Sequence, residues 1–220
     1  MRNAVSIRDD LVAVERRVAD ACARAGRRRD EVTLVAVSKT KPAAMIDDAI
    51  AAGVTEVGEN RVQEARDKKP VVRGSARWHL IGHLQSNKAK DAVRLFDVIQ
   101  TIDSVELAEK VARAAASAGK VQEVLIEVNI GNEPQKSGAA PADVERLARS
   151  IGSIDALRLR GLMAIPPAED ARRWFRDVRA LRDAAGLPEL SMGMTEDFET
   201  AIEEGATIIR VGRAIFGERG

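Results

Sequence analysis

The chain has 220 residues, a length that suits one large α/β domain or two small ones. It carries 35 Lys and Arg against 34 Asp and Glu, and a net charge of +1 gives no general attraction to nucleic acids or membranes. The single cysteine excludes a disulfide within the chain and metal sites built from paired cysteines. Because residues 1–10 lack a secretory stretch and no apolar run is long enough to span a bilayer, we expect a soluble, cytoplasmic protein.

The first predicted element is an amphipathic helix, with Leu11, Val14, Val18 and Cys22 at helical spacing and Gly26 at its end. After it, short Val/Ile/Leu-rich runs alternate with longer Ala-rich amphipathic stretches, which is typical of successive βα units. The predicted strands are 32–38, 55–58, 77–81, 97–101, 122–129, 157–163, 189–192 and 207–211. The predicted helices between them are 42–52, 60–69, 87–94, 104–118, 141–151, 169–185 and 195–204.

About eight strands is the number that closes a TIM-type (β/α)8 barrel, so we predict a single α/β barrel domain over residues 1–220 with an extra N-terminal helix. An open doubly wound sheet is the competing architecture. It would normally show a glycine fingerprint after the first strand, and Ser38-Lys39-Thr40-Lys41-Pro42 is not one. The predicted helix boundaries carry suitable capping residues: Pro42, Ser104, Pro141 and Thr195 at starts, and Gly53, Gly119 and Gly186 at ends.

Polar residues follow the predicted strands, and in a barrel of this kind ligands bind at the carboxyl ends of the strands. The residues in question are Lys39, Glu59, Asn60, His83, Gln85, Thr101, Asp103, Asn129, Ser191, Arg210, Gly212 and Arg213. If the first and last strands are neighbours, Lys39 and Arg210 meet at one rim. A lone lysine there is a candidate Schiff-base nucleophile, although a lysine before a proline at a strand end is usually a solvated loop charge.

Two stretches near the end of the chain suit a phosphate group. Ser191-Met192-Gly193-Met194-Thr195 offers a hydroxyl and a closely approachable backbone, and Gly212-Arg213-Ala214-Ile215-Phe216-Gly217 offers N–H groups after the last strand. Taken singly, Gly193 and Gly212 would be ordinary turn glycines. Together with Lys39 they match a phosphorylated aldehyde held by an imine at one end and by N–H groups at the other, which is how pyridoxal 5′-phosphate (PLP) binds.

Arg210 then takes a place beside the pyridine nitrogen. A guanidinium donates a hydrogen bond to that nitrogen but does not readily protonate it, and an unprotonated pyridine is a poor electron sink. The alternative is an ion pair inside the barrel with Glu59 or Glu127.

The chain resembles a known family in seven segments, which run in order from the first strand to the C-terminus: Ala36-Val37-Ser38-Lys39-Thr40-Lys41-Pro42, Gly58-Glu59-Asn60, Trp78-His79-Leu80-Ile81-Gly82-His83-Leu84-Gln85-Ser86-Asn87-Lys88, Lys136-Ser137-Gly138, Gly161-Leu162-Met163-Ala164-Ile165-Pro166, Leu190-Ser191-Met192-Gly193-Met194 and Arg210-Val211-Gly212-Arg213-Ala214-Ile215-Phe216-Gly217. They resemble the pyridoxal phosphate homeostasis protein family, which is similar to the N-terminal barrel of alanine racemase.

The resemblance implies a PLP carrier or regulator of vitamin B6 balance, with no established catalytic turnover. It implies that Lys39 carries PLP as an aldimine and that Arg210 faces the pyridine nitrogen. Asn60 would lie beside the ring, and Ser191, Gly212 and Arg213 would hold the phosphate.

Three functions remain open at this point. The first is a non-catalytic monomer that stores PLP and delivers it to apo-enzymes. The second is a racemase or lyase of low rate with Lys39 as its only base. Because the chain contains 0 Tyr and ends directly after the last barrel motif, we expect neither the tyrosine base nor the second domain of alanine racemase. His79 and His83 are interpreted as a strand-face polar group and a capping residue. The third is a Schiff-base aldolase without cofactor. Lys136 is interpreted as a solvated loop lysine, and the alternative is a second residue on which the aldehyde lands during transfer.

Overall fold

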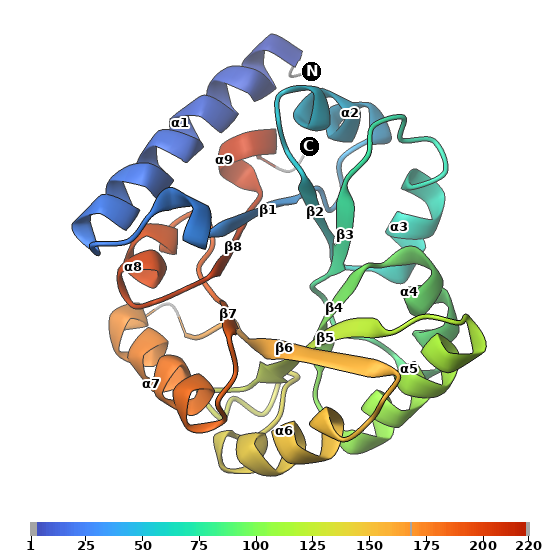
Figure 1. The fold of residues 1–220 in the computed structure, drawn as a ribbon. Helices are drawn as coiled ribbons and strands as arrows, with labels where there is room; N and C mark the ends of the chain where they lie inside the picture. Colours follow the sequence, from blue (N-terminus) through green and yellow to red (C-terminus); the bar gives the residue numbers. More distant parts are fainter. Residues whose placement is uncertain (1–3, 168, 219–220) are drawn as a thin grey trace.

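The computed structural model describes residues 4–167 and 169–218, and over these residues it is a closed barrel of parallel strands ringed by helices (Figure 1). The strands follow one another around the barrel in chain order, and β8 closes it by pairing with β1. Their bounds are β1 Thr33–Val37, β2 Glu56–Glu59, β3 Arg77–Leu80, β4 Val98–Ile102, β5 Gln122–Val128, β6 Leu157–Ala164, β7 Glu189–Ser191 and β8 Ile208–Val211. The predicted barrel is therefore confirmed.

Helices connect the strands on the outside. They are α1 Ala4–Arg24, α2 Ala43–Ala51, α3 Val62–Lys68, α4 Ala89–Leu95, α5 Val105–Ser117, α6 Val144–Gly152, α7 Ala171–Ala184, α8 Phe198–Glu203 and α9 Arg213–Phe216, with short 3-10 turns η1 Arg29–Glu31, η2 Ser86–Lys88 and η3 Pro141–Asp143. The extra N-terminal helix α1 packs outside the barrel against α2, α8 and α9. Within the described part of the chain, no helix has the length and apolar character needed to cross a membrane.

Two apolar clusters stabilise this arrangement. The larger lies between the strands and the surrounding helices, and it includes Trp78, Phe175 and Phe198. The smaller joins residues of five strands and fills the barrel interior: Val35, Val98, Leu125, Met163 and Ile208. Because alternate residues of a strand face opposite sides, the residues two positions further along each strand also face the interior, toward its carboxyl end.

Most predicted boundaries lie within one or two residues of the observed ones. Gly119 and Gly186 both have φ of +65°, a conformation that glycine adopts without steric cost at the end of a helix. Ser104 caps α5, since its hydroxyl accepts a hydrogen bond from Leu107 N at 3.3 Å. The prediction that Thr195 starts a helix is wrong, because residues 195–197 form a turn and α8 begins at Phe198.

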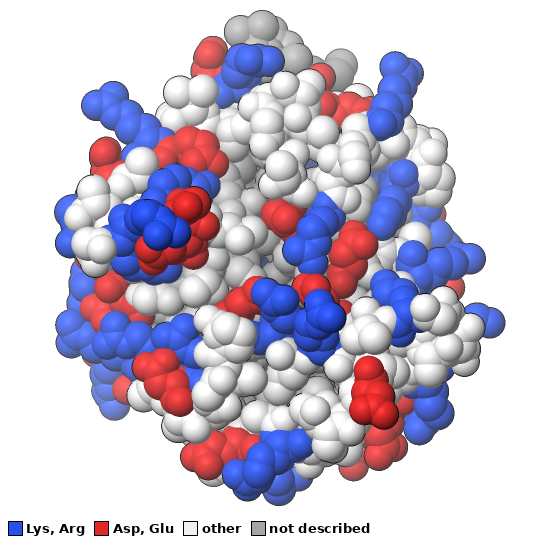
Figure 2. Space-filling view, viewed as in Figure 1, with Lys and Arg blue, Asp and Glu red and all other residues white. Residues whose placement is uncertain are grey.

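Cationic and anionic side chains are interspersed over the molecular face shown in Figure 2. Many of them are paired, as expected from the near-equal counts of the two signs. The face therefore presents no large field of one sign, which agrees with the net charge of +1.

Candidate functional site

The carboxyl ends of β1 and β8 lie side by side. Val35 pairs with Arg210 and Ala36 with Val211, and a Cβ on Gly212 would lie 3.2 Å from the carbonyl oxygen of Val37. Lys39 follows the end of β1 by two residues, so it lies at the rim above Arg210. The prediction that the first and last strands bring these two residues to one rim is confirmed.

The turn that carries Lys39 has an unusual backbone. Thr40, the next residue, has φ of +64°, a left-handed conformation that costs a threonine energy. Its N–H donates to the carboxylate of Glu64 at 2.8 Å, which satisfies the backbone in this conformation. Glu64, a residue of α3, thus holds the turn that carries Lys39 in place.

Lys68 ties this turn to β2. Its ammonium donates to the Ser38 carbonyl at 2.9 Å, to Glu59 Oε1 at 2.8 Å and to Glu64 Oε2 at 3.0 Å. Glu59 is fully buried and also accepts from the Ser38 hydroxyl at 2.7 Å. Burial raises the pKa of Glu59, and the bonds from Lys68 and Ser38 oppose that rise.

Arg210 is a buried cation without a carboxylate partner. Its relative exposure is 3%, its Nη1 donates to Ser191 Oγ at 2.7 Å and its Nη2 to the Ala164 carbonyl at 2.9 Å. Among the described residues it forms no direct ion pair, so the alternative of such a pair with Glu59 or Glu127 is wrong. The charges of Asp197 and Glu127 act on Arg210 from a greater distance. Desolvation lowers its pKa to about 10, and the guanidinium remains charged at neutral pH.

Ser191 and Asn60 differ in how their polar atoms are used. The Ser191 hydroxyl is fully buried, donates to Gln100 Oε1 at 2.6 Å and accepts from Arg210. The Oδ1 atom of Asn60, at the end of β2, is buried with no hydrogen-bond partner in the part of the chain described. Asn60 therefore retains the capacity to bind a ligand at this rim.

The two predicted phosphate segments lie next to each other, because Arg210 N donates to the Gly193 carbonyl at 3.0 Å. Gly193 has φ of +91°, and a Cβ there would lie 2.5 Å from Ala201 Cβ, so only glycine fits against α8. Gly212 precedes α9, a helix that we did not predict as an element. The N–H groups of Ile215 and Phe216 donate to the Gly212 carbonyl, whereas those of Arg213 and Ala214 have no acceptor within the helix. The Arg213 guanidinium is half-exposed and pairs with Glu196 at 2.8 Å.

Three further polar residues at the rim have structural partners. The Thr101 hydroxyl donates to the Gly82 carbonyl at 3.0 Å, and the Asn129 amide holds the loop after β5 at the carbonyls of Glu133 and Lys136. Lys136 is one-third exposed and pairs with Glu133 at 2.5 Å, so it is a loop lysine with a partner.

The two histidines lie in different places. His79 is buried, as expected for a strand-face polar group. His83 does not cap a helix, because η2 begins after Gln85 and α4 after Lys88. Instead His83 Nδ1 lies 3.9 Å from Asp103 Oδ2.

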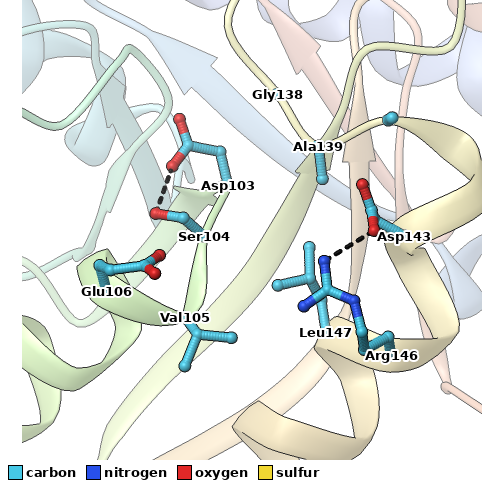
Figure 3. A pocket seen from close by; sticks show the side chains of 10 residues that line it. Asp103, Ser104, Val105, Glu106, Gly138, Ala139, Asp143, Arg146 and Leu147 are labelled. Carbon is cyan, nitrogen blue, oxygen red and sulfur yellow. Dashed lines mark hydrogen bonds and ion pairs between the residues drawn. The ribbon is translucent and has the colours of Figure 1, made fainter.

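Two clefts flank the rim. One has a volume of about 320 Å³ and lies between α5 and α6, where Asp103, Ser104 and Glu106 face Asp143 and Arg146 (Figure 3). The other, about 330 Å³, adjoins Asn60 and is lined by the loop after β3 and by α3. Over residues 4–167 and 169–218, no cluster of three His, Cys, Asp or Glu side chains could hold a metal ion.

The sequence did not identify Glu127 as a site residue. Its Oε2 is buried without a hydrogen-bond partner, and Arg210 and Asp103 are the charges that act on it. Burial, and then Asp103, raises the pKa of Glu127 to about 7, and Arg210 opposes the rise. Its position two residues after the interior residue Leu125 was a usable signal, because strand alternation turns both residues inward.

Comparison with known proteins gives consistent results. The family model described as "Alanine racemase, N-terminal domain" matches residues 10–220. A protein of Aquifex aeolicus named "Pyridoxal phosphate homeostasis protein" is 41% identical over 220 residues, covering 95% of this chain and 96% of the relative. PipY of Synechococcus elongatus, solved with PLP bound, is 38% identical with a TM-score of 0.81 over 91% of this chain and 100% of that one. An alanine racemase of Clostridium difficile is 13% identical with a TM-score of 0.76, over 97% of this chain and 56% of the racemase, and shares the fold.

Proposed function

The chain belongs to the pyridoxal phosphate homeostasis protein family, and we propose that it binds PLP as an aldimine on Lys39 and delivers it to apo-enzymes without turnover of its own. The observation that carries this proposal is Arg210, a cation with 3% exposure whose acceptors in the described structure are the Ser191 hydroxyl and the Ala164 carbonyl, with no direct carboxylate pair. A buried charge is costly unless a ligand or neighbour satisfies it. A pyridine nitrogen is an acceptor that can use the remaining N–H donors of this guanidinium.

The other residues at the rim fit the same ligand. Asn60 has an amide whose Oδ1 has no partner, and either end of an amide can face a ligand, because the two orientations differ little in shape. Gly212 and Arg213 supply N–H groups at the start of α9 for the phosphate. Since the Ser191 hydroxyl gives its proton to Gln100, we assign any phosphate contact of Ser191 to the backbone beside it.

The site favours carriage over catalysis. PLP supplies a reactive aldehyde and, when its ring nitrogen is protonated, an electron sink. Arg210 does not readily give up a proton, so the ring would stay unprotonated and the sink weak. We therefore propose a cytoplasmic monomer that keeps the aldehyde covalently bound until another protein receives it.

Absorption of the purified protein at about 420 nm, followed by borohydride reduction and peptide mapping, tests the cofactor site. We expect a yellow protein with the reduced adduct on Lys39. Lys39→Ala should be colourless, and the matched control Lys41→Ala, whose ammonium bonds the Glu218 carbonyl, should remain yellow. A colourless wild-type protein that takes up no added PLP would overturn the proposal.

Delivery is tested by mixing the loaded protein with an apo-form of a PLP-dependent enzyme while a carbonyl trap removes free PLP. We expect recovered activity in the presence of the trap. Recovery only when the trap is omitted would mean that PLP is merely released into solution, and the delivery part of the proposal would then be wrong.

A racemase or lyase of low rate is the second candidate, and Glu127 is the observation that favours it. A carboxyl group with a pKa of about 7, close to Arg210, is suited to proton transfer at neutral pH. Chiral amino-acid assays on the loaded protein test this. A kcat of about 1 per second or more, abolished by Glu127→Gln, would replace the carrier function by an enzymatic one.

A further inference from the structure

A chain of hydrogen-bonded side chains crosses the barrel interior beneath the proposed cofactor site. Arg210 Nη1 donates to Ser191 Oγ at 2.7 Å, and Ser191 Oγ donates to Gln100 Oε1 at 2.6 Å. Gln100 Nε2 lies 2.8 Å from His79 Nδ1, and His79 Nε2 lies 2.6 Å from Glu56 Oε2. Strands β4 and β7 are not neighbours in the barrel, so the bond between Gln100 and Ser191 spans its interior.

The donors and acceptors assign a direction to this chain. Arg210 can only donate, so Ser191 accepts from it and has one proton left for Gln100. The Gln100 amide then turns its NH2 group toward His79 Nδ1, which must be an unprotonated acceptor.

The remaining proton of a neutral His79 ring therefore lies on Nε2 and is donated to Glu56. In the reverse orientation of the Gln100 amide, its NH2 group would face Ser191 and the Ser191 hydroxyl proton would have no acceptor. Every bond thus points away from Arg210, an arrangement in which successive hydrogen bonds strengthen one another.

Burial makes the chain sensitive to the loss of any member. Gln100 and Ser191 are fully buried, and His79 is 2% exposed. A buried polar group that loses its partner bears the full cost of its desolvation. The hydroxyl of Ser191 therefore has a fixed position, and with the Ala164 carbonyl it gives the Arg210 guanidinium two fixed acceptors.

We propose that Gln100 and His79 are positioning residues for Arg210, and that they orient its remaining N–H donors toward the acceptor nitrogen of a heteroaromatic ring. This inference rests on the proposed function, in which that ring is the pyridine of PLP. Two acceptors determine the plane of a guanidinium, so moving the Ser191 hydroxyl would rotate the donors that face the ligand. The hydrogen-bonded side chains thus link β2, β3, β4 and β7 to Arg210, the residue that would donate a hydrogen bond to the ring nitrogen.

The test is the ¹⁵N chemical shift of the ring nitrogen of labelled PLP, measured together with PLP affinity. In Gln100→Leu we expect the shift to move toward that of a nitrogen without a donor, and PLP to bind about tenfold more weakly, the cost of a hydrogen bond to a charged group. The borohydride adduct on Lys39 should still form, because the imine forms at the aldehyde of PLP and does not use the hydrogen bond to the ring nitrogen.

Gln122→Leu is the matched control, since Gln122 is an equally buried glutamine. Its amide donates to the carbonyls of Asp97 and Glu123, which do not belong to the hydrogen-bonded series from Arg210 to Glu56. It should retain the wild-type shift and affinity. If Gln100→Leu does not fold, Ser191→Ala removes the same link with a smaller change and should move the shift in the same direction. Gln100→Glu, which keeps an acceptor for Ser191, should restore the shift.

A wild-type shift in both Gln100→Leu and Ser191→Ala, with PLP still on Lys39, would overturn the positioning role and leave PLP binding intact. A wild-type protein that forms no adduct at all would instead contradict the proposed function. The two failures are therefore distinguishable.

Discussion

Glu127 is a carboxyl group whose environment opposes its charge. Its Oε2 has no hydrogen-bond partner in the described structure, and burial is the first cause that raises its pKa to about 7. The folded protein therefore holds this proton more tightly than the unfolded chain does. Its contribution to stability is fully present below the unfolded pKa of about 4.3 and is lost as the pH rises through about 7.

Glu127→Gln should remove this pH dependence. Over the range from about pH 4 to pH 8, the free energy of unfolding of the PLP-free wild type should lose up to about 3 kcal/mol that the variant does not lose. Urea unfolding at several pH values measures this difference. Glu109→Gln, at a half-exposed position on α5, is the control and should follow the wild type, and a parallel pH profile for Glu127→Gln would contradict the prediction.

Lys68 neutralises two carboxylates and supports the Lys39 turn. Lys68→Met should leave the buried Glu59 and the neighbouring Glu64 without a cation, at a cost of about 3 kcal/mol in the free energy of unfolding. It should also slow adduct formation, because Glu64 holds Thr40 in its left-handed conformation. Denaturation and the rate of absorbance gain on PLP addition measure these effects. Lys90→Met, at an exposed position on α4, should change neither.

The location of a site residue was predictable from the sequence where its position at the end of a single strand is enough to place it. Lys39 and Arg210 follow from their places at the ends of apolar runs, because the barrel brings these ends together. Gln100, Glu56 and Lys68 were not predictable in the same way. Their roles come from partners on other strands and helices, which strand alternation alone does not identify.

At the scale of elements, Glu204 connects α7 and α8. Its side chain is 6% exposed and lies 2.6 Å from Arg172, 3.1 Å from Arg176 and 3.5 Å from Arg179. The three arginines share one face of α7, as their spacing in a helix requires. Because α8 also packs against Gly193, this contact supports the predicted phosphate segment.

Glu204→Gln should destabilise the protein by about 2 kcal/mol, because three guanidinium groups would face a neutral amide. Glu199→Gln is the matched control at the other side of α8. Glu199 forms a bidentate pair with Arg17 at 2.9 Å, but it is one-third exposed, so its loss should cost less than about 1 kcal/mol. Equal urea midpoints for the two variants would contradict this prediction, because they would show that the greater burial of Glu204 does not make its loss more costly than that of Glu199.

The elements themselves were predictable from periodicity and end signals, and the two errors have a common cause. The start of α8 was placed at Thr195, but the Asp197 carboxylate accepts a hydrogen bond from Met194 N at 2.6 Å and holds a turn there. The four-residue helix α9 is too short to show a hydrophobic period. In both places local hydrogen bonds near the site determine the backbone.

At the scale of the whole molecule, the barrel is least extensively paired where the predicted site lies. Strand β7 spans three residues and pairs in register with β8 only at Ser191 and Ile208, whereas β5 pairs with β6 from Gln122 to Val128. Short pairing means that fewer hydrogen bonds must break for local opening. The region around β7 should therefore open more readily than the rest of the barrel.

Binding of PLP should close this region, because the predicted site combines Lys39 after β1, Ser191 of β7 and Arg210 of β8. A ligand that binds only the closed form stabilises it in proportion to its affinity. Hydrogen exchange of the Met192, Thr207 and Arg210 amides, which bond across β7 and β8, should be faster than exchange of the β5 amides in the PLP-free protein and should slow about tenfold or more with PLP. Lys39→Ala should show little slowing at the same PLP concentration. Uniform slowing over all strands would mean that PLP stabilises the barrel as one unit, and the β7 region would then not be a separate opening site.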